Sequence, residues 1–118
     1  MAQLLKIETE DGADGIRIIR LTGPFILNNI FEFQTLARQQ TDSTILLDLS
    51  GVPYMDSAGL GVLIGLLVSC HRKGRGFGVT GVAERIMTLF KVAGVDGTIP
   101  VFDSIEAAKS KLVQATSA

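Results

Sequence analysis

Few side chains in this chain could do chemistry, and the most informative of them is Ser57. It follows Asp56, shortly after the apolar run Ile45–Leu49, and stands where a helix is expected to begin. Asp56 or Ser57 there can accept hydrogen bonds from the free amides of the first helical turn, which stabilises a helix by about 1 kcal/mol. The Ser57 hydroxyl can also carry a phosphate, which would make it a switch. The residues around Ser57 must decide between these two roles.

A serine nucleophile needs a base within about 3 Å. Met55–Gly59 lacks the first glycine of the G-x-S-x-G elbow of serine hydrolases. The single histidine, His71, is expected near the far end of the same helix, about 20 Å from Ser57 at a rise of about 1.5 Å per residue. The sequence therefore predicts no catalytic residue, and His71 is interpreted as a cation at a helix end.

Metal, nucleotide and RNA sites find equally little support. The adjacent Cys70 and His71 cannot supply the three or four ligands of a zinc site, so neither a metal nor a cofactor is expected. Arg75–Gly81 resembles the start of an RNA-binding RNP1 motif, but Val79 and Gly81 replace two of its aromatic residues. The same glycines do not form the G-x-G-x-x-G pattern of dinucleotide sites. No direct nucleic-acid binding is predicted.

Three glycines follow Ser57 within the expected helix: Gly59, Gly61 and Gly65. Each costs a helix up to about 1 kcal/mol relative to alanine, which indicates that something approaches the backbone closely. Gly61 and Gly65 share a face and would let the helix lie near the sheet. Gly59, in the first turn, would leave the Ser57 hydroxyl less crowded.

The composition describes an unusually apolar small domain. Hydrophobic residues make up 47% of the 118 residues and charged residues 19%, and the mean hydropathy is +0.37. Some apolar surface is therefore expected to face a partner or a second copy of the chain, which leaves a homodimer open. The net charge of −1 creates no field that favours nucleic acid or an anionic membrane.

The compartment is expected to be the cytoplasm. Cys70 is the only cysteine, so a disulfide framework is impossible. Met1–Lys6 does not resemble a signal peptide. The uncharged stretch Ser57–Cys70 is shorter than the roughly 20 residues needed to cross a bilayer, so no membrane insertion is predicted.

The pattern along the chain predicts the order β-β-α-β-α-β-α-β-α, an α/β fold with about five strands and about four helices. Strands are expected at Leu4–Thr9, Ile16–Leu21, Thr44–Leu49, Gly76–Thr80 and Ile99–Phe102. Helices are expected after a cap at Asn28 or Asn29, over Ser57–Cys70, over Val82–Val92, and after a capping box of Asp103 with Glu106. The first two strands form a hairpin on a mixed, mostly parallel sheet. Sites in such sheets gather beyond the carboxyl ends of the strands, where Ser57 lies.

The run Leu47–Leu63 resembles the signature of STAS domains, specifically of bacterial anti-sigma-factor antagonists. Their pattern is a D-[FL] strand, a short loop and then D-S-[AS]-G-[LI]-G, which Asp48-Leu49 and Asp56–Gly61 match. Element order and length also agree over essentially the whole chain, so residues 1–118 are expected to form a single STAS domain.

The resemblance implies a non-enzymatic regulator of transcription. Ser57 would be the phosphoacceptor, and the unphosphorylated form would bind an anti-sigma factor with serine kinase activity, with a serine phosphatase as a second partner. The partner-binding residues that it implies are Asp56, Ser57, Ala58, Gly59, Leu60, Gly61, Phe25, Ile26 and Asn28.

One departure from the family pattern leaves an alternative open. Family members usually carry an aspartate in the loop after the second strand, where this chain has Ile26. An isoleucine there removes a charge from the binding surface. The alternative is a STAS subunit of a permanent assembly, such as a lipid-transport or stress-signalling complex, in which Ser57 is only a cap. A small-molecule-binding or enzymatic domain is a third class, but no convergent polar constellation supports it.

Overall fold

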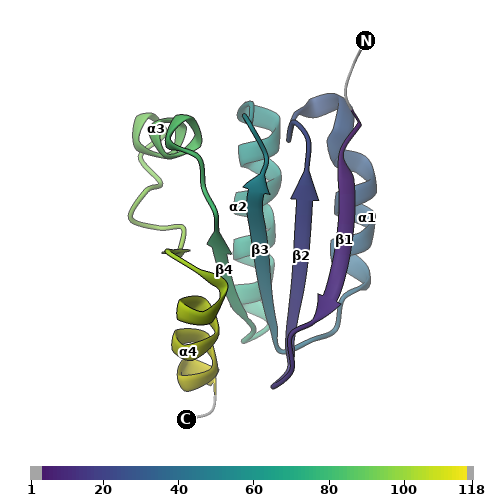
Figure 1. Cartoon of the computed structure of the whole chain (residues 1–118), viewed down its shortest axis with the longest axis vertical. Coiled ribbons are helices and arrows are strands. Elements are labelled where there is room, and N and C mark those ends of the chain that lie inside the picture. Colours follow the sequence, from purple (N-terminus) through teal and green to yellow (C-terminus); the bar gives the residue numbers. More distant parts are fainter. Residues whose placement is uncertain (1–3, 117–118) are drawn as a thin grey trace.

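A five-stranded sheet in the order β1-β2-β3-β4-β5 forms the centre of the molecule, which the computed structural model describes over residues 4–116 (Figure 1). The strands are β1 Lys6–Asp11, β2 Ile16–Thr22, β3 Thr44–Gly51, β4 Gly76–Thr80 and β5 Val101–Phe102. β1 pairs with β2 in antiparallel fashion, and all other neighbours are parallel. The predicted fold class and order of elements are confirmed.

Helices cover the two faces of the sheet unequally. They are a short 3-10 helix η1 at Leu27–Asn29, α1 at Ile30–Gln39, α2 at Ser57–Arg72, α3 at Glu84–Val92 and α4 at Ile105–Thr116. α1 and α2 lie side by side behind the sheet in Figure 1. With α3 they enclose the larger core, whereas α4 covers a smaller cluster on the opposite face.

Charged side chains pair across β1, β2 and β3 on the part of the second face that α4 does not cover. Arg20 on β2 donates to Glu10 on β1, and its Nε lies 3.4 Å from a carboxylate oxygen of Asp48 on β3. The hydrogen bond that Arg20 donates to Glu10 is the main cause that raises the pKa of Arg20. Charge thus replaces apolar packing where no helix covers the sheet.

The hairpin shows why strand ends were harder to predict than strand order. β1 begins and ends two residues later than the predicted Leu4–Thr9. The turn contains Ala13, Asp14 and Gly15 in the left-handed region, with φ of 67°, 55° and 78°. This turn sets the register, which pairs Asp11 with Arg17 and Lys6 with Thr22.

Two predicted helix caps were wrong. Asn29 occupies the position before α1, but its side chain donates to the carbonyl of Pro24 at 2.9 Å and makes no capping bond. For α4, the cap is Ser104, whose Oγ accepts from the amide of Ala107 at 3.0 Å, rather than Asp103. At α1 the Asn29 side chain bonds to the preceding loop instead of the helix, and at α4 the residue next to the predicted cap takes its place.

α2 begins at Ser57 as predicted and ends at Arg72, two residues beyond the predicted Cys70. His71 and Arg72 lie in its last turn, near the negative end of the helix dipole, and Gly74 follows with φ 68°. No helix in the described part of the chain has the length and apolarity needed to span a bilayer. The described residues begin at Leu4 and end at Thr116. The predictions on a signal peptide and on the domain's ends extend to residues outside this range.

Candidate functional site

Two loops lie side by side where β2 and β3 end. The amide of Gly23 donates to the carbonyl of Gly51 at 2.9 Å, and the amide of Phe25 donates to the carbonyl of Tyr54 at 3.1 Å. Further along, the amide of Asp56 donates back to the carbonyl of Phe25 at 3.4 Å. These bonds continue the parallel pairing of the strands into the loops. They bring the segment around Ile26 next to the start of α2.

Asp56 joins both loops through its carboxylate. One oxygen, Oδ1, accepts from the amide of Gly59 at 2.8 Å and caps α2. The other oxygen, Oδ2, accepts from the amide of Leu27 at 3.1 Å, in the loop after β2. Asp56 is therefore the residue that caps α2, which leaves Ser57 without that role.

Ser57 is the first residue of α2 and is exposed. Its hydroxyl makes no hydrogen bond within the part of the chain that the structure describes. The free amides of the first turn give this end of the helix a partial positive charge, which favours an added anion, while the Asp56 carboxylate opposes one. His71 lies in the last turn of the same helix, so it is out of reach as a base.

Gly59 lets the two loops pack closely. A Cβ at this position would overlap the carbonyl oxygen of Phe25 and lie 2.9 Å from its ring carbon Cδ2. The Phe25 ring is fully buried and packs edge-on against Phe33 of α1, with ring centroids 5.2 Å apart. Gly59 thus serves the packing of Phe25, which corrects the interpretation that it frees the Ser57 hydroxyl.

The predicted partner-binding residues lie together but differ in exposure. The exposed residues are Ser57, Asn28 and Gly61. The half-buried residues are Ile26, Asp56 and Ala58, and the buried residues are Phe25, Gly59 and Leu60. Their side chains therefore divide into a surface and the support beneath it. Contact of this surface with a partner stays a prediction.

Two exposed apolar side chains at this end of the sheet were missed by sequence reasoning. Leu27 is 56% exposed in η1, and Tyr54 is 39% exposed in the loop before Asp56. Aromatic residues are enriched at protein interfaces, so a tyrosine two residues before Asp56 was the signal that could have pointed here. Leu27 had no such signal, because apolar residues in the same segment, such as Phe25, are buried.

The comparisons with known proteins agree on one family. The STAS domain family matches residues 7–108. The anti-sigma-B factor antagonist of Staphylococcus aureus (strain NCTC 8325 / PS 47) is 33% identical over 75 residues, which are 64% of this chain and 69% of that protein. The protein of the same name from Staphylococcus epidermidis is 33% identical over 69 residues, and the chain spans 64% of its length.

Solved structures share the fold at lower identity. An anti-sigma factor antagonist from Mycobacterium paratuberculosis superposes with a TM-score of 0.81 and 21% identity, over 92% of this chain and 93% of that one. The Bacillus cell fate determinant SpoIIAA in its phosphorylated form superposes with a TM-score of 0.68 and 17% identity, over 90% and 99% of the two chains.

Proposed function

The chain belongs to the STAS domain family, and from this membership we propose that it is an anti-sigma-factor antagonist. In this proposal it is a cytoplasmic binding module without enzymatic activity, formed by the whole chain as one domain. Its unphosphorylated form binds an anti-sigma factor with serine kinase activity, and phosphate on Ser57 releases that partner. A serine phosphatase would restore the binding form.

The observation that carries the proposal is the position of the Ser57 hydroxyl. It is exposed, it makes no hydrogen bond in the described part of the chain, and the capping role is already filled by Asp56. A kinase can therefore reach the hydroxyl without first breaking a native contact. The similarity to two staphylococcal anti-sigma-B factor antagonists, and to SpoIIAA, whose phosphorylated form has been solved, supports the same proposal.

The physical effect of a phosphate falls on the interface rather than on the fold. Phosphorylation adds about −1.5 to −2 charges and three acceptor oxygens. The start of α2 tolerates that charge, by about 0.3–1 kcal/mol in its favour, so the domain stays folded. A partner packed over Ser57 would have to bury an unpaired charge, which costs several kcal/mol. Each 1.4 kcal/mol lowers the affinity about tenfold, so release follows.

The exposed side chains near Ser57 define the surface that the partner would cover. Leu27 and Tyr54 supply apolar contact, and Asn28 supplies a polar one. Phe25 and Leu60 are buried beneath them, so they would set the shape of this surface without touching the partner.

The test begins with capture of partners from the native host and mass spectrometry of Ser57. The purified partner is then mixed with ATP and the wild-type chain, Ser57→Ala or Ser57→Asp. We expect phosphate on wild-type Ser57, tight binding by Ser57→Ala, and binding weakened at least about tenfold by Ser57→Asp, because an aspartate places charge at the interface.

A matched control is Ser43→Ala, since Ser43 is also exposed but precedes β3 at the other end of the sheet. It should accept phosphate at Ser57 and bind as the wild type does. Equal binding by Ser57→Ala and Ser57→Asp would contradict the switch.

Ile26 supports the alternative function, in which the chain is a STAS subunit of a permanent assembly. The Ile26 side chain is half-buried next to Leu27, whose amide donates to the Asp56 carboxylate, and the family usually places a carboxylate at this position. One stoichiometric complex, recovered with Ser57 unmodified under every growth condition, would favour a permanent STAS subunit instead.

A further inference from the structure

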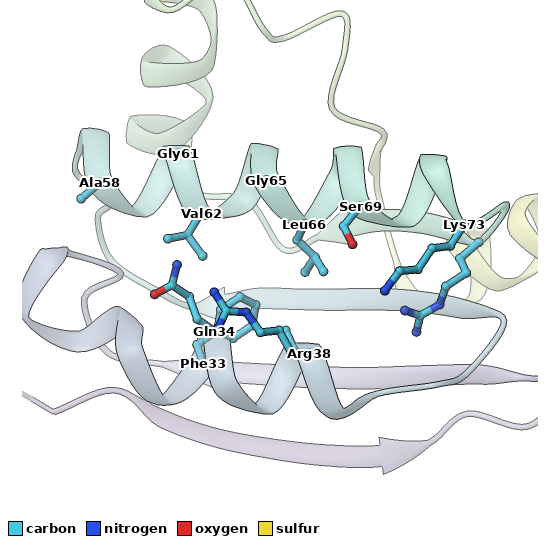
Figure 2. A pocket seen from close by; sticks show the side chains of 12 residues that line it. Phe33, Gln34, Arg38, Ala58, Gly61, Val62, Gly65, Leu66, Ser69 and Lys73 are labelled. Atoms are coloured by element: carbon cyan, nitrogen blue, oxygen red, sulfur yellow. The ribbon is translucent and has the colours of Figure 1, made fainter.

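A groove of about 450 Å³ runs between α1 and α2 on the outer side of the helical layer (Figure 2). Its lining comes from three segments: α1, α2 and the residues just before β4. Its apolar part is formed by Phe33, Ala37, Ala58, Val62 and Leu66. Figure 2 shows Val62 and Leu66 of α2 pointing toward α1 across this space. The volume lies in the range of small-molecule sites.

Gly61 and Gly65 keep the α2 side of the groove open. Both line it, and a Cβ added to either would meet no atom within 4 Å. The expectation that they bring α2 close to the sheet is therefore wrong, because the buried residues Leu60 and Leu63 face the core instead. Each glycine costs the helix up to about 1 kcal/mol, and no contact within the described chain explains that cost. An occupant of the groove would explain it.

One end of the groove is cationic. Lys73 and Arg75 line it just after the end of α2, and none of the described residues that line the groove is acidic. The nearby Asp42 does not neutralise them, since its carboxylate pairs with Arg17 and only its backbone carbonyl accepts from Arg75 Nε, at 2.6 Å. Figure 2 shows Lys73, which follows α2, directed into the groove at this end, and Arg38 of α1 directed into its middle, beside Gln34.

Arg75 also has an unused donor at this end. Its Nη2 is buried and has no hydrogen-bond partner among the described residues. A buried donor without a partner is unfavourable, so an acceptor that reached it would be stabilising. The bond from Nε to the carbonyl of Asp42 holds the guanidinium in place.

We propose that the groove between α1 and α2 binds a fatty acid. The hydrocarbon chain would lie along Val62 and Leu66, over the space that Gly61 and Gly65 leave open. The carboxylate would lie at Lys73 and Arg75, where it can accept charge-assisted hydrogen bonds. From Ala58 to Lys73 the groove follows about 22 Å of α2, which suits one extended chain. The proposal is independent of any role of Ser57.

Titration of the isotope-labelled full chain with dodecanoate below its micelle concentration tests the proposal. Amide shifts are expected for the residues that line the groove on α1 and α2. Dodecanol and inorganic phosphate, which carry only the tail or only the charge, should each bind at least about tenfold more weakly, since a charge-assisted hydrogen bond or the apolar contact is missing.

Two variants with matched controls locate the site. Gly65→Leu adds a side chain whose Cβ meets no atom within 4 Å and whose remaining atoms enter the groove, and it should abolish dodecanoate binding while the amide spectrum stays that of a folded chain. Its control is Val68→Leu, an exposed position on α2 that does not line the groove. Lys73→Gln should weaken binding about tenfold, whereas Arg72→Gln, exposed in the last turn and away from the groove, should leave it unchanged.

Three results would overturn the proposal. One is dodecanoate binding that Gly65→Leu leaves intact. Another is equal affinity for dodecanol, since the cationic end would then play no part. The third is a concentration-dependent shift of the groove residues without any additive, which would assign this surface to a second copy of the chain.

Discussion

The first turn of α2 and its middle carry the same residue type in opposite surroundings. At Gly59 the neighbouring loop packs so closely that no Cβ fits. At Gly61 and Gly65 nothing lies within 4 Å of where a Cβ would be. The first glycine is required by the fold, and the other two are not. A glycine in a helix therefore indicates either a close contact or a kept space, and only the packing around it distinguishes them.

The largest effect on this comparison is expected from Gly59→Ala. The added methyl group would overlap the carbonyl oxygen of Phe25, which is backbone and cannot rotate away. We expect the free energy of unfolding to fall by about 3 kcal/mol, as for severe overpacking. Urea unfolding at 25 °C measures this fall. A loss below about 1 kcal/mol would mean that the loop around Phe25 shifts freely, and the contrast with Gly61 would fail.

The next largest loss of stability is expected at Asp56, whose carboxylate joins the start of α2 to the loop after β2. Asp56→Ala removes the bonds from the amides of Gly59 and Leu27, and should lower the free energy of unfolding by about 2 kcal/mol. Asp56→Asn keeps one oxygen acceptor and an effective cap, so it should lose only about 1 kcal/mol. Urea unfolding of both variants resolves the difference. Equal losses would show that the bond to Leu27 contributes nothing.

Alanine substitutions in the middle of α2, at Gly61 and Gly65, should raise stability instead of lowering it. Gly61→Ala and Gly65→Ala meet no atom, and alanine raises helix propensity, so each should raise the free energy of unfolding by up to about 1 kcal/mol. Both are measured beside Gly59→Ala under the same conditions. Destabilisation by either variant would show that the groove closes over these positions in solution.

The difference between the two glycine environments could not be predicted from the sequence, although most of the fold could. Strands and helices followed from hydrophobic periodicity, and the resemblance to STAS domains implied that Phe25 and Asp56 belong to one surface. The rotation of α2 about its axis was not readable, since Ser57–Cys70 carries no charge to mark a solvent face. The groove depends on that rotation and on three segments far apart in the chain, so no local pattern indicates it.

The smallest effect is expected on the closed side of α2, at Cys70. Burial raises the pKa of this thiol above its ordinary value of 9.0, and the charges of Arg75 and Lys73 only partly oppose that shift. Below pH 9 the thiol is protonated in both states and contributes nothing. Above it the unfolded chain loses the proton more readily than the native one, so stability falls as the pH rises. Urea unfolding at pH 7.5 and pH 10 should show a steeper decline for the wild type than for Cys70→Ala. Equal declines would show that the thiol titrates normally, and that this face of α2 is as open to water as the groove.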